Sequence, residues 1–223
     1  MKKYLFLSLC VVSLFSCKKG DNQKLEANNT PITDYMSTKQ GSWWMYGSQN
    51  GDITIRRATG RDSFMLDREY NYYETTDTGS NYVTPEYFGK NGDKFLMLVD
   101  LDGSMSKYMA VVVSKDSAQV GDEFSNTANM TYSAIPLNLL TEGDVVSTNE
   151  SMTINNHTYD NLVKVKNALK AKPVISPSYI NCGSVTMWIK PGLGIVRAEF
   201  DIHISSFYSR QYTDSLIDYH IEP

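Results

Sequence analysis

The sequence predicts an all-β protein built on one large curved antiparallel sheet, open-barrel or sandwich-like, with at most one or two short helical turns. Three observations support this class. From Trp43 onward, apolar and polar residues alternate with the period of two that is typical of half-buried strands. Gly, Asn and Asp interrupt the alternation every eight to twelve residues or so. No segment has a convincing helical period of 3.6 residues.

The clearest strand covers residues 195–205, where one face is apolar and Arg197 and Glu199 begin the polar face. Its apolar face consists of Val196, Ala198, Phe200, Ile202 and Ile204. Further strands are expected at residues 42–47, 53–58, 63–74, 82–88, 94–101, 107–114, 130–135, 145–154, 159–168, 185–190 and 212–221.

Three dipeptides predict hairpin turns, because Gly, Asn and Asp tolerate a positive φ: Asn50-Gly51, Asn91-Gly92 and Asp102-Gly103. The best helical candidate is a turn or two at residues 136–141, which Pro136 could open at its first position.

The N-terminus carries an export signal that ends in a cysteine. Lys2 and Lys3 precede an apolar run at residues 4–14 that is too short to span a bilayer, and Cys17 follows Ser16 directly. This pattern resembles the lipobox of bacterial lipoproteins. The resemblance implies cleavage before Cys17 and attachment of diacylglycerol and a further acyl chain, such as palmitate, to that residue. A plain secretory signal and an N-terminal helix are the alternatives.

Lipidation of Cys17 predicts the membrane as a partner and a place in the cell envelope. Each buried CH₂ contributes about 0.8 kcal/mol, so two or three acyl chains anchor a protein stably. Lys18 rather than Asp follows the cysteine, which favours the outer membrane, and residues 18–21 lack an acidic run, which favours its periplasmic face over the cell surface. Residues 17–33 are polar and would form a tether reaching about 20–25 Å. Residues 34–223 are expected to form a single β domain.

Composition excludes nucleic acid as a partner. Removal of residues 1–16 leaves 207 residues, in which 19 basic residues face 25 acidic ones, so the clustered basic footprint of a nucleic-acid-binding protein is missing. Cys10 leaves with the signal and Cys17 carries lipid, so Cys182 has no disulfide partner. The domain must therefore rely on its core, which about 200 residues can build.

Residues 41–46 read GSWWMY and residues 188–197 read WIKPGLGIVR. They resemble the G-x-x-W-x-Y opening strand and the W-[YF]-A-K-G-[VL]-G-[MIL]-[VI]-K closing hairpin of the TapB-like exported lipoproteins, which also have a region similar to residues 159–166. The resemblance supports the fold and is almost silent on function. From the residues themselves, Gly192 and Gly194 indicate a tight hairpin. The aromatic residues of both motifs are expected in the core or at a sheet edge: Trp43, Tyr46 and Trp188.

Candidates for catalysis are few. Cys182 has no basic neighbour in sequence that would lower its pKa, which favours a buried structural thiol over a nucleophile. Two strands each place acidic and histidine residues on one expected face, where they either bind a metal or face water: Glu199, Asp201 and His203, and Asp214, Asp218 and His220. Because Arg197 lies in the same row, a solvated face is favoured. No metal or other cofactor is predicted.

Tyrosines concentrate in one stretch of strands. As candidate ligand-binding residues we take Tyr70, Tyr72, Tyr82 and Tyr87, which could stack on sugars or line a groove for a lipid or peptide. The alternative is that these tyrosines simply pack in strands, because tyrosine has an apolar body and a polar tip.

The leading hypothesis is a non-enzymatic outer-membrane lipoprotein that binds an apolar ligand or a partner protein. A surface glycan-binding module that uses the tyrosines is the first alternative. A hydrolase that uses Cys182 or the Asp/His rows is the second.

Overall fold

The computed structural model describes residues 35–100, 108–132, 135–204 and 208–223. Cys17, the export signal, the tether and the Asp102-Gly103 turn lie outside the described residues. Within these ranges no helix has the length and apolar character needed to cross a membrane. The described elements are β1 (Trp43–Ser48), β2 (Ile53–Met65), β3 (Arg68–Asp77), β4 (Val83–Asn91), β5 (Lys94–Asp100), β6 (Tyr108–Lys115), β7 (Glu123–Tyr132), β8 (Ile135–Ile154), β9 (His157–Pro173), β10 (Ile180–Lys190), β11 (Gly194–Ile204) and β12 (Tyr208–His220).

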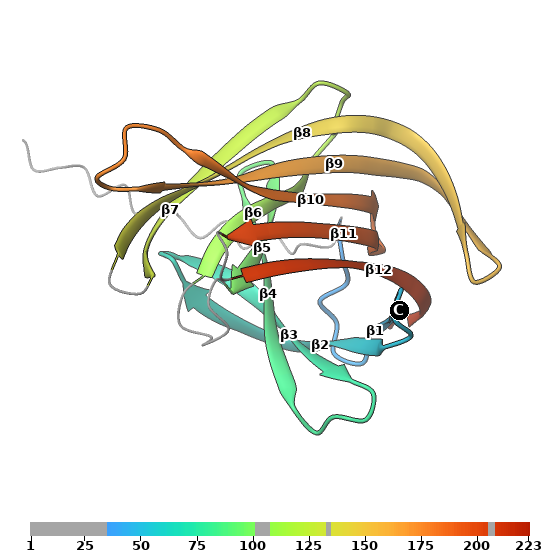
Figure 1. Ribbon diagram of the computed structural model, residues 1–223. Helices are drawn as coiled ribbons and strands as arrows, with labels where there is room; N and C mark the ends of the chain where they lie inside the picture. The colour runs from blue at the N-terminus through green and yellow to red at the C-terminus, as the bar shows by residue number, and fades with distance from the viewer. Residues whose placement is uncertain (1–34, 101–107, 133–134, 205–207) are drawn as a thin grey trace, which may run out of the picture.

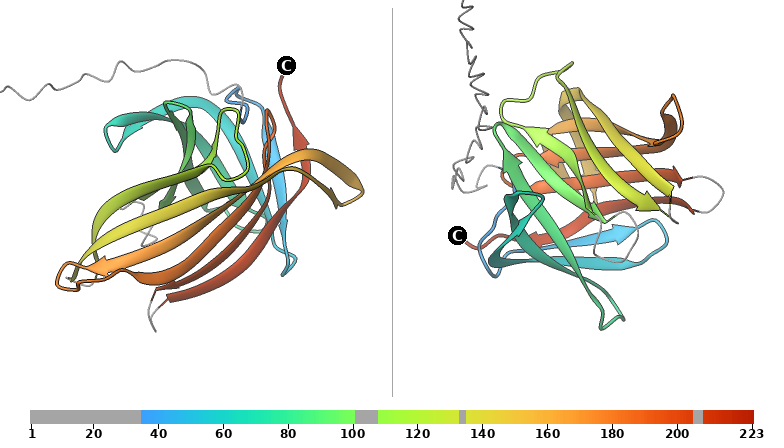
Figure 2. Two further views of the ribbon diagram at one scale, coloured as in Figure 1. Left: turned by 90° about the horizontal axis from the view of Figure 1, so that it is seen from above. Right: turned by 90° about the vertical axis from the view of Figure 1, so that its left-hand side faces the viewer.

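All twelve strands belong to one antiparallel sheet, in the order β6-β5-β4-β3-β2-β1-β12-β11-β10-β9-β8-β7. Almost every strand pairs with its neighbours in sequence, and the first and last strands pair with each other, with Trp43 opposite His220. The sheet is strongly curved, so that β3 to β6 lie across from β8 to β11 in a nearly closed barrel (Figures 1 and 2). The predicted all-β class with a large curved sheet is confirmed.

The two edge strands, β6 and β7, are consecutive in the chain and meet where the barrel would close. We call this line the seam. No backbone ladder joins β6 to β7 in the described part of the chain. Instead, Nδ2 of Asn126 donates to the carbonyl oxygen of Ala110 at 2.6 Å, and Nδ2 of Asn167 donates to that of Val112 at 3.1 Å. Side-chain amides therefore bond carbonyls of β6 that an exposed edge would leave to water.

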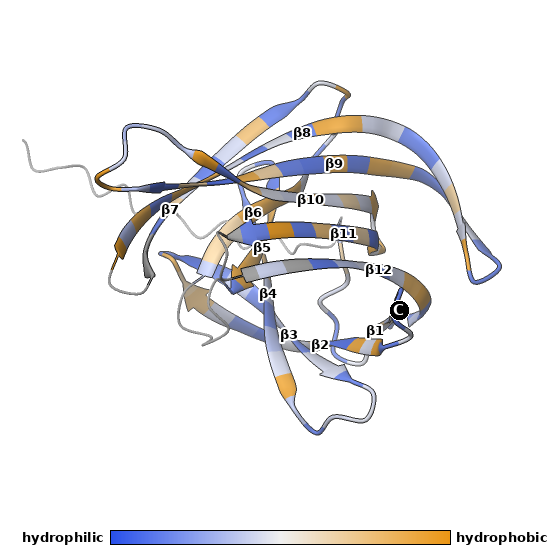
Figure 3. Cartoon of the chain, viewed as in Figure 1, coloured by the Kyte–Doolittle hydropathy of each residue, from blue (hydrophilic) through white to orange (hydrophobic). Residues whose placement is uncertain are grey.

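Alternation along the strands separates the core from the outer surface. On β9, Val165, Asn167 and Leu169 are buried, whereas the intervening Lys164 and Lys166 lie on the opposite face and are partly or fully exposed. The same alternation of hydrophilic and hydrophobic residues runs along the neighbouring strands in Figure 3. A residue pattern with period two thus places one face of each strand in the core, as the sequence predicts.

One expected strand, at residues 63–74, is wrong because a hairpin interrupts it. β2 ends at Met65 and β3 begins at Arg68, and the turn residues Leu66 and Asp67 adopt φ values of +49° and +60°. Asp often accepts this left-handed conformation, but an apolar residue such as leucine rarely does. The turn therefore carries no glycine signal, and the continuous alternation concealed it.

The region from residue 123 to 141 also differs from the prediction. The helical turn expected at residues 136–141 is wrong, because these residues lie in β8 and pair with β7, with Pro136 opposite Thr131. The strand expected at residues 130–135 is wrong, because β7 ends at Tyr132, β8 begins at Ile135, and these two residues pair with each other. β7 itself was missed, since its sequence EFSNTANMTY is mostly polar. A polar edge strand leaves only a weak hydrophobic pattern.

Candidate functional site

The four candidate tyrosines occupy different environments. Tyr70 on β3 is 1% exposed, so its ring has no face to offer to a sugar. Tyr82, just before β4, is 61% exposed. Tyr72 on β3 and Tyr87 on β4 are half-buried and directly opposite each other in the ladder, with ring centroids 5.6 Å apart. The structure therefore brings Tyr72 and Tyr87 together and separates Tyr70 and Tyr82 from that pair.

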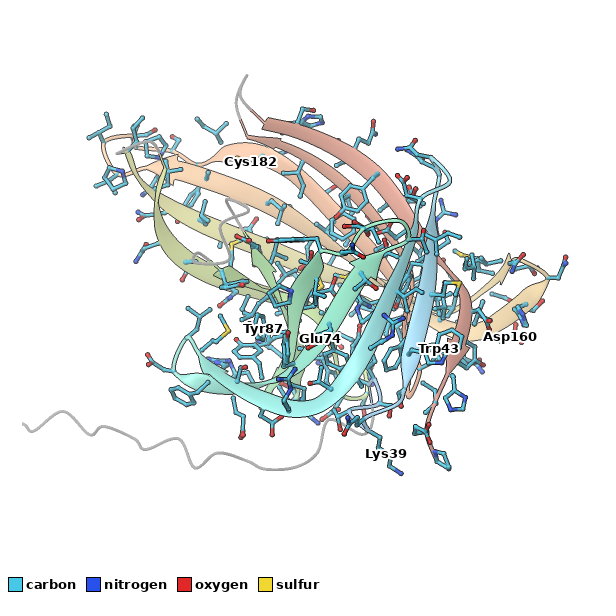
Figure 4. All side chains as sticks on the ribbon, turned by 90° about the horizontal axis from the view of Figure 1, so that it is seen from below. Lys39, Trp43, Glu74, Tyr87, Asp160 and Cys182 are labelled. Carbon is cyan, nitrogen blue, oxygen red and sulfur yellow. The ribbon has the colours of Figure 1, made fainter. Side chains whose placement is uncertain are left out.

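Tyr72 and Tyr87 continue into a row that ends at Tyr108 on β6, whose ring is 5.5 Å from that of Tyr87. The Tyr72 hydroxyl donates to Oε1 of Glu74 at 3.3 Å, and Arg61 lies 4.8 Å above the Tyr72 ring. Figure 4 shows Glu74 and Tyr87 close together on this half of the sheet. Burial raises the pKa of Tyr108 to about 12, so its phenol is neutral at physiological pH.

A cavity of about 280 Å³ lies at the seam, beside the end of this tyrosine row. Its apolar lining comes from Leu96 on β5 and from Ala110 and Val112 on β6, and residues 125–129 of β7 form the facing wall. The residues that complete it are Leu66, Arg68, Tyr70, Asn91, Lys94 and Tyr108. This seam cavity is slightly smaller than the 300–1,000 Å³ or so of most ligand pockets.

The charge of the seam cavity is positive. Arg68 and Lys94 line it, and no acidic residue does so among the described lining residues. Neither cation has an ion-pair partner in the described part of the chain.

Tyr70 lines the seam cavity, and its hydroxyl is an unsatisfied polar group. This oxygen is buried and has no hydrogen-bond partner among the described residues. Burial raises the pKa of Tyr70, and the charge of Arg68 opposes that shift without cancelling it. The phenol therefore keeps its proton at neutral pH. A buried hydroxyl without a partner costs about 1–3 kcal/mol, and a ligand in the cavity could satisfy it.

A second polar cluster, in the barrel interior, is internally satisfied. The buried Arg56 forms an ion pair with Glu86, and its Nη1 donates to the Tyr46 hydroxyl at 2.9 Å. Its guanidinium lies 4.9 Å from the Tyr46 ring centroid and 5.0 Å from that of Phe88. Burial raises the pKa of Tyr46 to about 12, although Arg56 acts in the opposite sense. Because Arg56 has its counter-ion and a hydrogen-bond acceptor within this cluster, we assign the cluster a structural role in the core.

Sequence reasoning missed both Arg56 and the two cavity cations. Arg56 gave no clear local signal, because the apolar Ile53 and Ile55 lie on the other face of the strand, and only the pairing of β1 with β2 places Arg56 opposite the buried Trp44. Arg68 and Lys94 gave no local signal, since lysine and arginine are common at strand ends and only the tertiary structure brings them to the lining of one cavity.

The two motifs that carry the family resemblance contact each other. Nε1 of Trp44 donates to the carbonyl oxygen of Leu193 at 2.8 Å, and the Tyr46 hydroxyl donates to that of Ile195 at 3.0 Å. Residues 190 and 194 flank the predicted hairpin, which is present between β10 and β11. Tyr46 and Trp188 are buried and Trp43 is half-buried, in agreement with their expected roles.

The hydrolase candidates are not assembled into a catalytic site. Cys182 is 8% exposed, and burial raises the pKa of its thiol, which disfavours the reactive thiolate. His203 contacts Asp201 at 2.6 Å, and the described residues contain no group of three metal-ligating side chains.

The expectation that Asp214 and Asp218 share a face is wrong. A bulge opposite Met45 and Tyr46 shifts the register, so Asp214 lies opposite the buried Ala198 whereas Asp218 is exposed.

Comparisons with known proteins add information on the fold. No family model matches the chain, and no curated protein matches it. Among solved structures, the chain is similar to a protein described as a "putative lipoprotein from Parabacteroides distasonis", determined at 2.70 Å resolution. The alignment covers 84% of this chain and 99% of the other, with 14% identity and a TM-score of 0.54. At this identity the similarity establishes a shared fold.

Proposed function

We propose that this chain is a lipid-anchored protein of the bacterial outer membrane that binds a small ligand in the seam cavity and catalyses no reaction. The observation that carries the proposal is the seam cavity itself, where Arg68, Lys94 and the Tyr70 hydroxyl lack partners in the described part of the chain. Buried polar groups are normally satisfied, so a cavity that collects the buried Tyr70 hydroxyl and two half-buried cations without ion-pair partners beside an apolar wall has the character of a binding site.

Two features support lipid anchoring. Cys17 follows a short apolar run, as in bacterial lipoproteins, and the similar structure from Parabacteroides distasonis belongs to a protein described as a putative lipoprotein. The resemblance of residues 41–46 and 188–197 to the TapB-like lipoproteins points the same way.

The anchor is tested by metabolic labelling with palmitate. The wild-type chain should incorporate label and sediment with outer-membrane fractions, whereas Cys17→Ala should do neither. Labelling that persists in Cys17→Ala would contradict the assignment. Protease treatment of intact cells then separates the two leaflets, since a periplasmic domain stays protected and a surface domain is digested.

Ligand binding is tested by filling the seam cavity. Ala128 on β7 lines the cavity and is partly buried, so Ala128→Trp should occupy much of its volume. Native mass spectrometry of the wild-type protein should detect a co-purifying small molecule that Ala128→Trp has lost. The matched control is Ala168→Trp on the outer face of β9, which should retain the molecule. Equal retention by both variants would locate the ligand elsewhere.

A second candidate function rests on the row formed by Tyr72, Tyr87 and Tyr108. Half-buried tyrosines in line on a sheet can stack on successive sugars, and Glu74 and Arg61 beside the row offer hydrogen bonds. A glycan array probed with wild type and with Tyr72→Ala tests it. A glycan signal that depends on Tyr72 supports glycan binding, and no signal in either protein removes it.

A further inference from the structure

We infer that the ligand of the seam cavity is a small anionic amphiphile, with one carboxylate or phosphate head and an apolar tail of about seven carbons. This inference rests on the proposed ligand-binding function and specifies the chemistry of the ligand. The head would contact Arg68, Lys94 and the Tyr70 hydroxyl, and the tail would lie along Leu96, Ala110 and Val112.

The sign of the ligand's charge follows from the lining. The complete chain has a net charge of −4, yet the only charged side chains among the described lining residues are the cations Arg68 and Lys94. Two like charges around one cavity repel each other, and in a partly desolvated site that repulsion is weakly screened. An anion between them would turn the repulsion into two attractive, charge-assisted contacts.

The Tyr70 hydroxyl is a further group that an anionic head can satisfy. It is buried without a partner among the described residues, and Gly89, opposite Tyr70 in the ladder, leaves room for its ring. A Cβ on Gly89 would approach Cδ1 of Tyr70 to 2.6 Å, so the ring position depends on this glycine. A protonated phenol can donate to a carboxylate or phosphate oxygen, but its oxygen can also accept from an ammonium group, so the sign of the charge is decided by Arg68 and Lys94.

The volume of the seam cavity and its aliphatic lining determine the length and the polarity of the ligand's tail. If each non-hydrogen atom takes roughly the 30 Å³ that a water molecule occupies in the liquid, a cavity of about 280 Å³ holds about nine such atoms. Octanoate has about this size. Its tail would meet aliphatic side chains from β5 and β6, while Asn126, whose amide already donates to Ala110, would remain part of the seam.

The test compares ligands that differ in head group alone. The mature lipidated protein is placed in lipid nanodiscs and titrated calorimetrically with octanoate, octyl phosphate, octan-1-ol and octylammonium, with empty nanodiscs as the blank. Octanoate or octyl phosphate should bind at least about tenfold more tightly than octan-1-ol, and octylammonium should not bind. The order of octanoate and octyl phosphate identifies the head as carboxylate or phosphate.

Variants then assign the selectivity to the proposed residues. Arg68→Gln, Lys94→Gln and Tyr70→Phe should each weaken octanoate binding by about tenfold without changing octan-1-ol binding. Arg68→Lys retains the charge and should preserve most of the affinity. The control Lys39→Gln removes a charge at an exposed position that does not line the cavity and should change nothing.

The failures of the two proposals are distinguishable. Equal affinities for octanoate and octan-1-ol, both abolished by Ala128→Trp, would overturn the anionic class and leave the cavity as an apolar site. Octylammonium binding more tightly than octanoate would also overturn it. If no probe binds and Ala128→Trp still retains the co-purifying molecule, the seam cavity is not the ligand site and both proposals fall.

Discussion

Asn167 on β9 and Val112 on β6 are 55 residues apart, yet Nδ2 of Asn167 donates to the Val112 carbonyl oxygen at 3.1 Å in the buried interior. This hydrogen bond joins two strands that share no backbone ladder in the described chain. Because β6 is an edge strand, its free carbonyls need partners wherever the barrel excludes water. Asn167 supplies one such partner and Asn126 another. The two amides hold the seam beside the cavity.

Replacement of Asn167 by leucine, whose side chain has the same number and branching of heavy atoms, should lower the free energy of unfolding by about 1–3 kcal/mol, because the buried Val112 carbonyl loses its donor. Urea denaturation measures the change. The matched control is Asn149→Leu at an exposed position on β8, where we expect a change below about 0.5 kcal/mol. Equal stability of Asn167→Leu and wild type would mean that the amide does not support the seam.

Gly143 on β8 gives the Phe124 and Asn167 side chains their space. A Cβ at this position would lie 2.1 Å from Cε2 of Phe124 and 2.5 Å from Oδ1 of Asn167. Gly143→Ala should therefore destabilise the protein by about 1–3 kcal/mol through overpacking. At Gly47 a Cβ would lie 3.3 Å from the methyl Cγ2 of Ile217, so Gly47→Ala should cost less. Thermal unfolding of the two variants checks the order.

Substitutions of Arg56 and Glu86 should have strongly non-additive effects on the free energy of unfolding. Arg56→Met leaves Glu86 without its ion-pair partner, and we expect a loss of about 3 kcal/mol, at the low end of the range because the Glu86 side chain is 26% exposed. The double variant Arg56→Met/Glu86→Leu should recover most of this loss. Arg57→Met, on the exposed face of the same strand, is the control. Additive effects of the two single substitutions in a double-mutant cycle would show that the pair does not act as a unit.

Glu150 on β8 predicts a pH dependence of stability. Burial by itself raises the pKa of Glu150, but hydrogen bonds from Ser147 and Trp188, together with the charge of Lys164, bring it below the ordinary 4.5. Its contribution should be complete about one pH unit above 4.5, the pKa in the unfolded chain, and should disappear as the pH falls through the lower folded-state pKa.

The stability difference between wild type and Glu150→Gln should accordingly be constant from neutral pH down to about 5.5 and shrink below it. Urea midpoints between pH 3 and 7 measure this difference. Glu69→Gln removes a carboxylate at an exposed site on β3 and controls for the change in net charge. A difference that grows on acidification would reverse the predicted sign.

Cys182 should react slowly with a thiol reagent in the native protein, because it is 8% exposed and burial raises its thiol pKa. Labelling is followed with dithionitrobenzoate in native buffer and in denaturant. Lys166→Cys in a Cys182→Ala background places a thiol on the exposed face of β9 and should react at once. Rapid native labelling of Cys182 would reopen the nucleophile hypothesis.

Sequence alone was sufficient for the class of the fold, because strand alternation and turn chemistry are local. The face assignments of Val165 and Lys164, and the hairpin at Gly192, follow from neighbouring residues. The prediction of turns and strands failed where neighbouring residues carried no signal. Leu66 adopts a positive φ without any glycine signal, and polar β7 forms a strand because β8 pairs with it.

The tertiary structure alone decided the seam and the candidate site. Arg68, Lys94 and Tyr70 gain their significance from the cavity between β7 and the strands β3, β5 and β6, where two half-buried cations and a buried phenol have no partners in the described chain. Chain curvature also brought Trp44 to Leu193 and Asn167 to Val112, contacts between residues far apart in sequence. Such contacts depend on how the whole sheet closes, and closure is set by the sum of many strand pairings that no local pattern encodes.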